Sequence, residues 1–133
     1  MALLTLIEGG VLERHPYLRI AFLEAGAGWL PYWLWRLDEL EYKQVGGEVA
    51  EHVRMKPSEY FRRQCVIAIE PGEPNLAETV RWAGEENLIF GTDFPHFDHD
   101  EHVVSRTLML TEILPERVLR KLLWDNAAAF YKF

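Results

Sequence analysis

Short apolar runs alternate with amphipathic stretches along the chain, and this alternation predicts an α/β fold. The runs at 18–24, 65–70 and 88–92 are almost free of polar residues, which is typical of strands buried on both faces of a parallel sheet. Apolar residues at helical spacing precede, separate and follow them. The order of helices and strands is the signature of βα units around a parallel sheet. We expect helices near 3–14, 30–42, 57–61, 76–84, 100–113, 115–124 and 127–131.

Glycine and proline mark the expected boundaries of these elements. Gly9-Gly10 interrupts the first helix without necessarily ending it, and Pro31 is tolerated in the first turn of the second. Asn75 occupies a helix N-cap position, and Gly84 follows the end of the same helix. Residues 43–56 are polar and weakly patterned, so we expect a surface excursion there.

Three parallel strands are too few for an independent sheet, because both faces and both edges need cover. A closed (β/α) barrel uses eight βα units and typically about 250 residues. The chain is therefore either a small complete α/β domain or a piece of a larger barrel. It starts inside a helical pattern with no capping residue before it, which favours the piece. A piece must find partner strands, so we expect residues 1–133 to form a single unit that self-associates as a homo-oligomer.

Composition narrows the class of protein. The chain is 49% apolar and carries a formal charge of −7 without a cluster of basic residues. A nucleic-acid partner is therefore not expected, because its phosphates require a basic face. Charged residues interrupt every candidate membrane span, and the first residues lack the features of a signal peptide. The single cysteine, Cys65, fits a reducing compartment, so we expect a cytoplasmic protein with Cys65 as an inert core residue.

Candidate chemistry lies where the strands end. In parallel α/β sheets, functional residues gather at the C-terminal ends of the strands, and the three runs end in Glu24, Glu70 and Asp93. Asp93 is the strongest candidate, since it follows an apolar strand through Gly91-Thr92. It could bind a divalent cation or orient a metal-bound water, or it could simply stabilise the turn. Spacing alone leaves both readings open.

Several motifs resemble the amidohydrolase superfamily, in the branch related to aminocarboxymuconate-semialdehyde and γ-resorcylate decarboxylases. The segment GTDFPH at 91–96 is similar to the last-strand motif of that family. The other matching segments occur in the family's order and cover nearly the whole chain. They are GVLERHPYLR at 10–19, LEAGAGWLP at 23–31, RLD at 36–38, PSEYF at 57–61 and NAAAFY at 126–131.

This resemblance implies that residues 1–133 are a single C-terminal portion of a metal-dependent (β/α)8 barrel, a partial barrel whose eighth strand supplies Asp93 as a metal ligand. It implies a divalent metal, zinc or else manganese or iron, and a small substrate that bears a carbonyl or carboxylate. It implies Asp93 as a catalytic residue, with His96 beside the metal. The position of Glu24 at a strand end makes it the second candidate catalytic residue, and Trp29, just beyond that end, is a candidate for lining the substrate pocket. His99 and His102 are read mainly as a solvated helix start, with metal binding as the alternative.

Two departures from the family pattern keep hydrolysis and decarboxylation both open. The family's His-x-His pair and its fifth-strand histidine have no counterpart among the 133 residues, so one copy cannot complete a catalytic metal site. Decarboxylase members also carry a histidine where this chain has Glu24. The alternative class is a non-catalytic α/β remnant that self-associates through its open strands. A flavodoxin-like domain is disfavoured, because no glycine-rich phosphate loop follows a strand.

The helix near 30–42 carries aromatic residues on two sides. Trp29, Trp33 and Arg36 share one face, for which core packing is the default reading. Tyr32 and Trp35 mark another side. We therefore expect this helix to be buried all round, partly against a second copy of the chain.

Overall fold

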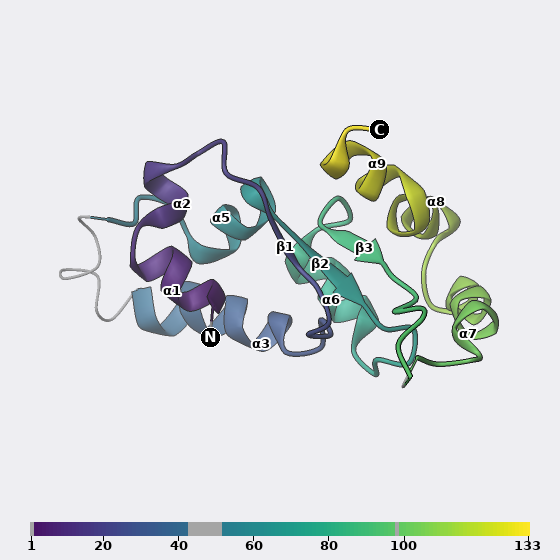
Figure 1. The fold of residues 1–133 in the computed structure, drawn as a ribbon. Coiled ribbons are helices and arrows are strands. Elements are labelled where there is room, and N and C mark those ends of the chain that lie inside the picture. Colours follow the sequence, from purple (N-terminus) through teal and green to yellow (C-terminus); the bar gives the residue numbers. More distant parts are fainter. Residues whose placement is uncertain (1, 43–51, 98) are drawn as a thin grey trace.

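The computed structural model of the 133-residue chain describes residues 2–42, 52–97 and 99–133. Helices and strands alternate as the apolar pattern predicts (Figure 1). Most of the expected excursion at 43–56 lies outside the described residues. The elements are α1 (Ala2–Glu8), α2 (Val11–Arg14), β1 (Ile20–Phe22), α3 (Leu30–Arg36), the π-helical turn η1 (Leu37–Glu41), α5 (Pro57–Gln64), β2 (Cys65–Ile69), α6 (Leu76–Ala83), β3 (Leu88–Phe90), α7 (Val103–Met109), the 3-10 turn η2 (Leu110–Glu112), α8 (Glu116–Arg120), the π-helical turn η3 (Lys121–Asp125) and α9 (Asn126–Tyr131).

Within the described residues, the strands form one parallel sheet in the order β1-β2-β3. The middle strand β2 is buried along almost its whole length, as expected for a strand covered on both faces. Ile67 pairs with Phe22 on one side and with Leu88 on the other. The prediction of parallel strands joined by helices is confirmed.

All three strands are shorter than the apolar runs that predicted them, for reasons visible in the register. β1 begins at Ile20 because its partner is Cys65, the first residue of β2, which follows α5 directly. β3 ends at Phe90 because its partner Ile69 is the last residue of β2. A short middle strand therefore limits both of its neighbours.

Helices gather at both ends of this sheet. In Figure 1, α1, α2, α3 and α5 lie together at one end, α7, α8 and α9 lie at the other, and α6 passes behind the sheet.

The hydrophobic core consists of aliphatic and aromatic side chains, and burial of one such side chain stabilises the fold by about 1.5–3 kcal/mol. Its fully buried members include Leu3, Ile7, Leu12, Leu30, Leu34, Tyr60, Phe61, Ile67, Leu76 and Leu88.

Two details of the helices differ from the expectation. Gly10 adopts φ 65°, a left-handed conformation, and it separates α1 from α2. The helix over 30–41 buries Leu30, Leu34 and Leu37, but Tyr32 and Trp35 remain 54% and 40% exposed. The prediction that this helix is buried on all sides is therefore wrong for a single copy of the chain, because only the leucine face of the helix packs into the core.

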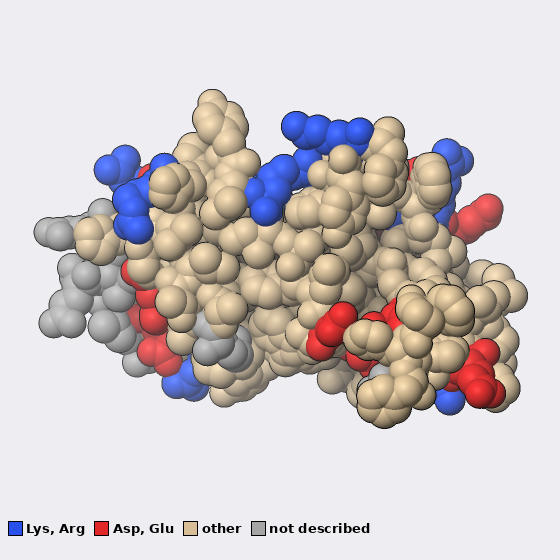
Figure 2. Space-filling model, in the orientation of Figure 1, with Lys and Arg blue, Asp and Glu red and all other residues tan. Residues whose placement is uncertain are grey.

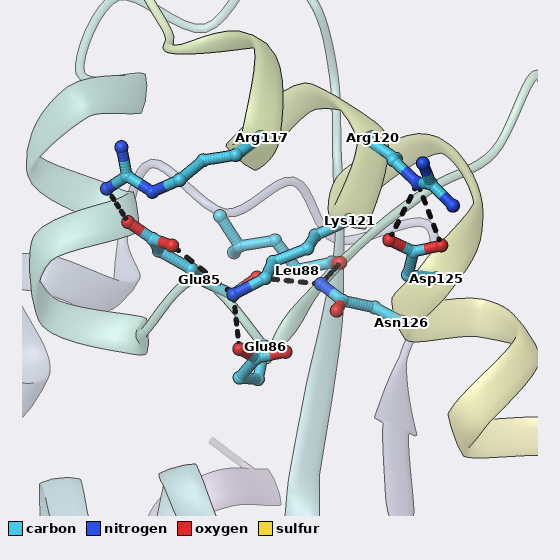
Figure 3. A network of polar contacts seen from close by, with 8 residues as sticks. All are labelled: Glu85, Glu86, Leu88, Arg117, Arg120, Lys121, Asp125 and Asn126. Atoms are coloured by element: carbon cyan, nitrogen blue, oxygen red, sulfur yellow. Dashed lines mark hydrogen bonds and ion pairs between the residues drawn. The ribbon is translucent and has the colours of Figure 1, made fainter.

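The C-terminal helices are tied to the turn before β3 by a polar network (Figure 3). The Asn126 side-chain amide donates to the carbonyls of Glu85 and Leu88, both at 2.7 Å. Arg117 pairs with Glu85 at 2.6 Å, and Lys121 pairs with Glu85 and Glu86. The network holds α8, η3 and α9 against the start of the strand that leads to Asp93.

Cys65 lies in the core, as expected. Its thiol is 1% exposed, and burial raises its pKa to about 12. Among the described helices, none has the length and apolar character that crossing a bilayer demands.

Candidate metal and active site

The candidate site lies at the C-terminal edge of the sheet, where the connections after β1 and β3 approach each other. Neighbouring strands are about 4.8 Å apart, so β1 and β3, which flank β2, are separated by roughly twice that distance. Nevertheless, ligand atoms of Glu24, Asp93 and His96 all lie within 4.8 Å of one another. The side chains of Glu24 and Asp93 therefore reach toward each other across the end of β2.

The three side chains form a solvent-exposed cluster of two carboxylates and one imidazole. His96 Nδ1 lies 3.2 Å from Asp93 Oδ2. Two carboxylates this close repel each other, and a cation between them would relieve that repulsion. Carboxylate oxygens and imidazole nitrogen are ligands that zinc, manganese and iron accept. The donor set fits a divalent metal, although further ligands are needed to complete a coordination sphere.

The backbone turns sharply at both carboxylates. Glu24 has φ 54° and Asp93 has φ 56°, a left-handed conformation that costs a non-glycine residue roughly 1–2 kcal/mol. Glu24 follows shortly after the end of β1 at Phe22, and Asp93 follows shortly after the end of β3 at Phe90. Such conformations concentrate at functional sites. Asp93 tolerates the conformation better than Glu24, because short polar side chains can stabilise it locally.

The segment after Asp93 holds His96 in place through local contacts. The His96 amide donates to the Asp93 carbonyl at 2.9 Å, so the chain folds back immediately and returns the imidazole to the carboxylate. His99 contacts the His96 carbonyl through Nδ1 at 2.7 Å, and His102 precedes α7. The described cluster includes neither of them.

The other residues singled out from the sequence lie near the cluster without joining it. Glu70 is exposed at the end of β2 and is absent from the described cluster. Trp29 packs edge-on against Phe22, with ring centroids 6.4 Å apart. Its indole N–H donates to the Ala25 and Gly26 carbonyls at 3.0 and 2.9 Å. Trp29 therefore supports the loop that carries Glu24, and its role toward a substrate stays a prediction.

Glu73 is a residue of this region that the sequence did not suggest. It lies in the β2–α6 connection, and its Oε1 accepts a hydrogen bond from the Ala27 amide at 2.6 Å. Burial raises the pKa of Glu73, whereas the amide bonds from Ala27 and Gly28 lower it. The signal available in the sequence was indirect: the run of small residues at 25–28 leaves room beside β1 for a side chain from elsewhere.

Charge is unevenly distributed over the face seen in Figure 2. Lys and Arg side chains lie mainly along the upper edge, and Asp and Glu lie mainly in the lower half. In the same orientation, Figure 1 shows the strands running from the upper left to the lower right. The edge that bears the cluster is therefore the more acidic one, as suits a cation.

A parallel βα sheet with carboxylate and imidazole donors at its C-terminal edge is the arrangement that metal-dependent enzymes built on (β/α) barrels use. A family model described as Amidohydrolase matches residues 2–133. The chain belongs to the amidohydrolase family.

Known proteins of this kind support the fold. The chain is 28% identical over 130 residues to a 2-amino-3-carboxymuconate-6-semialdehyde decarboxylase of Dictyostelium discoideum, covering 98% of the chain and 35% of that protein. A solved 5-carboxyvanillate decarboxylase from Sphingomonas paucimobilis superimposes with a TM-score of 0.79 at 27% identity, covering 99% of the chain and 38% of that structure.

A third structure, a dihydroxybenzoic acid decarboxylase from Polaromonas sp. JS666, contains bound manganese and the inhibitor 2-nitroresorcinol. Its TM-score is 0.76 at 21% identity, with 98% of the chain and 38% of that structure covered, so the similarity concerns the fold alone. The chain spans little more than a third of the length of these relatives. The prediction of a partial barrel is confirmed.

Proposed function

We propose that this chain contributes the carboxylate-bearing part of a divalent-metal site in an enzyme that decarboxylates a small carboxylate-bearing substrate. The observation that carries the proposal is the convergence of Glu24, Asp93 and His96 within 4.8 Å at the C-terminal edge of the sheet. Zinc, manganese and iron suit this donor set. The remaining ligands come from outside these 133 residues, either from a longer chain or from a second copy.

Each residue of the cluster has a role that its geometry suits. Asp93 binds the metal, and His96, 3.2 Å from it, orients that carboxylate and contacts the substrate. Glu24 transfers a proton, and Trp29 supports its loop and lines the pocket. When bound, the metal polarises a substrate oxygen. In decarboxylation the bond to the carboxylate carbon breaks, its electron pair stays on the remaining carbon, and the proton that replaces CO2 comes from Glu24.

The relatives favour decarboxylation over hydrolysis, because the curated relative and the 27%-identical structure are both named as decarboxylases. Their names describe small carboxylic acids, and this supports the same substrate class here. Hydrolysis is the alternative outcome of the assay, since Glu24 could equally activate a water as a general base.

The test measures zinc, manganese and iron in the purified chain by elemental analysis after equilibrium dialysis. Asp93→Asn should lose the metal, whereas Glu70→Gln, which alters another carboxylate at a strand end, should retain it. Metal-loaded protein is then incubated with small aromatic carboxylic acids and with matched amides, and CO2 and ammonia are measured. Equal metal content in the wild type and Asp93→Asn would contradict the proposal.

A second candidate function is a non-catalytic, self-associating domain. Among the described residues, the outer strands β1 and β3 each pair on one side only, and an open edge invites another strand. Folded oligomers that bind no metal and turn over no substrate would favour this candidate. Under either candidate function, we propose that the protein is a homo-oligomer and is located in the cytoplasm.

A further inference from the structure

The loop formed by Glu24–Gly28 connects β1 to α3, and hydrogen bonds from two sides hold its shape. Trp29 Nε1 donates to the carbonyls of Ala25 and Gly26 at 3.0 and 2.9 Å. Glu73 Oε1 accepts a hydrogen bond from the Ala27 amide at 2.6 Å, and the neighbouring Gly28 amide also lowers the pKa of this carboxyl group. Trp29 therefore binds two carbonyls of the loop, and Glu73 binds the amide that follows them.

The Glu24–Gly28 loop is closely fitted around the Glu73 carboxylate. Gly26 has φ 57°, and a Cβ built on it would lie 2.5 Å from Glu73 Oε1. Ala27, the next residue, is completely buried. A side chain at Gly26 would displace either the loop or the Glu73 carboxylate. The loop and the carboxylate therefore fix each other's position.

Glu73 is an unusual choice for a merely structural contact. Its Oε2 is buried and has no hydrogen-bond partner in the part of the chain that the structure describes. Burial raises the pKa of this carboxyl group, so its charged form is partly desolvated. A neutral side chain would fill the same space without that cost, but a carboxylate is the stronger acceptor for a backbone amide.

We propose that Glu73 is a positioning residue: it holds the Glu24–Gly28 loop in the shape that brings the Glu24 carboxylate to Asp93 and His96. This inference rests on the proposed role of Glu24 in the site. Glu24 begins the loop in a left-handed conformation, and nothing in its own strand imposes that turn, because β1 already ends at Phe22. Glu73 acts through the β2–α6 connection, whose start is fixed by the bond from the Glu73 amide to the Glu70 carbonyl at 3.1 Å.

The test compares the wild-type chain with Glu73→Gln, Glu73→Ala and the control Glu70→Gln by nuclear magnetic resonance. The control changes an exposed carboxylate of the same connection and leaves its backbone bond intact. We expect Glu73→Ala to move the amide protons of Ala27 and Gly28 upfield. The carbon shifts that report a left-handed residue at Glu24 should be lost. Glu73→Gln should show a partial change, because its side-chain oxygen still accepts an amide.

Titration with Mn²⁺ adds a readout at the cluster itself. In the wild type, bound Mn²⁺ should broaden the signals of Glu24, Asp93 and His96 together. In Glu73→Ala, broadening should remain at Asp93 and His96 and decrease at Glu24. If Mn²⁺ broadens none of the three in the wild type, the proposed metal site fails, while the Glu24 carbon shifts still decide the role of Glu73.

Unchanged carbon shifts at Glu24 in both Glu73 variants would overturn the inference, whether or not the amide shifts of Ala27 and Gly28 move. Should Glu73→Ala not fold, Glu73→Gln carries the comparison, because it preserves the shape of the side chain.

Discussion

Gly26 and Gly28 lie two residues apart in the Glu24–Gly28 loop, yet the structure places opposite demands on them. Gly26 combines a positive φ with the close approach of Glu73, whereas a Cβ on Gly28 meets no described atom within 4 Å. We predict that Gly26→Ala lowers the free energy of unfolding by about 1–3 kcal/mol, and that Gly28→Ala changes it by less than about 0.5 kcal/mol. Urea unfolding of the two variants measures the difference. Equal effects would show that the Glu73 contact does not constrain the loop.

The chemical state of Cys65 follows from its burial. Because burial raises the thiol pKa to about 12, and because only the thiolate is nucleophilic, we expect Cys65 to react slowly with a thiol reagent such as DTNB in the native state at pH 8. Reaction should become fast in urea. Rapid labelling of the native chain would mean that β2 opens far more readily than its packing indicates.

The residues of the cluster were predictable from the sequence to different degrees. Asp93 and Glu24 follow from one rule, that polar residues at the C-terminal ends of parallel strands carry the chemistry. The same rule also picked Glu70, which lies outside the described cluster. Sequence position alone does not show which of these side chains reach one another across the sheet. Glu73 escaped prediction because its partner is a backbone amide 46 residues away in the chain, and such a contact leaves no residue pattern.

At the scale of elements, Asn126 connects the last helix to β3. Its side chain is 4% exposed and donates to two backbone carbonyls. We predict that Asn126→Ala destabilises the fold by about 2 kcal/mol, because buried carbonyls lose their donors. The control is Asn75→Ala, at a helix start where the asparagine side chain makes no capping bond, and it should cost less than about 0.5 kcal/mol. Thermal or urea unfolding of both variants would show whether the two asparagines differ in this way.

The ion pairs around Glu85 make the same junction dependent on pH. Hydrogen bonds from Arg117 and Lys121 lower the pKa of Glu85 below its ordinary 4.5. A lowered folded-state pKa means that this stabilisation is fully present above the unfolded pKa and is lost as pH falls through the folded one. The difference in unfolding free energy between the wild type and Glu85→Gln should therefore shrink between pH 6 and pH 3. A constant difference across that range would indicate that the pairs contribute nothing.

Element types were more predictable than element ends. The apolar runs identified each strand, and Gly84 marked the end of a helix, because these signals are local. The start of β1 and the end of β3 depend instead on where β2 starts and ends, which is a tertiary property. The aromatic face with Tyr32 and Trp35 illustrates the same limit, since periodicity cannot tell a core contact from a surface reserved for another chain.

At the scale of the whole molecule, the cluster and the open sheet edges have a common explanation. The chain covers little more than a third of its relatives. Among the described residues, both outer strands of the sheet have an open edge, and the proposed metal site has only the donors of Glu24, Asp93 and His96. Whatever supplies the missing ligands must approach the C-terminal edge of the sheet. A second copy of the chain that pairs along β1 or β3 would bring a second set of donors to the same edge.

This reasoning predicts that metal binding and self-association are coupled. A ligand that binds the assembled form better than the monomer shifts the equilibrium toward assembly. In sedimentation velocity experiments, zinc or manganese should move the wild-type chain toward a larger species. Asp93→Asn should remove that dependence on metal while leaving metal-free association unchanged, since Asp93 is not part of a strand. If the metal bound to the chain without changing the size of the sedimenting species, all donors would lie within one copy. The cluster of Glu24, Asp93 and His96 would then bind the ion by itself.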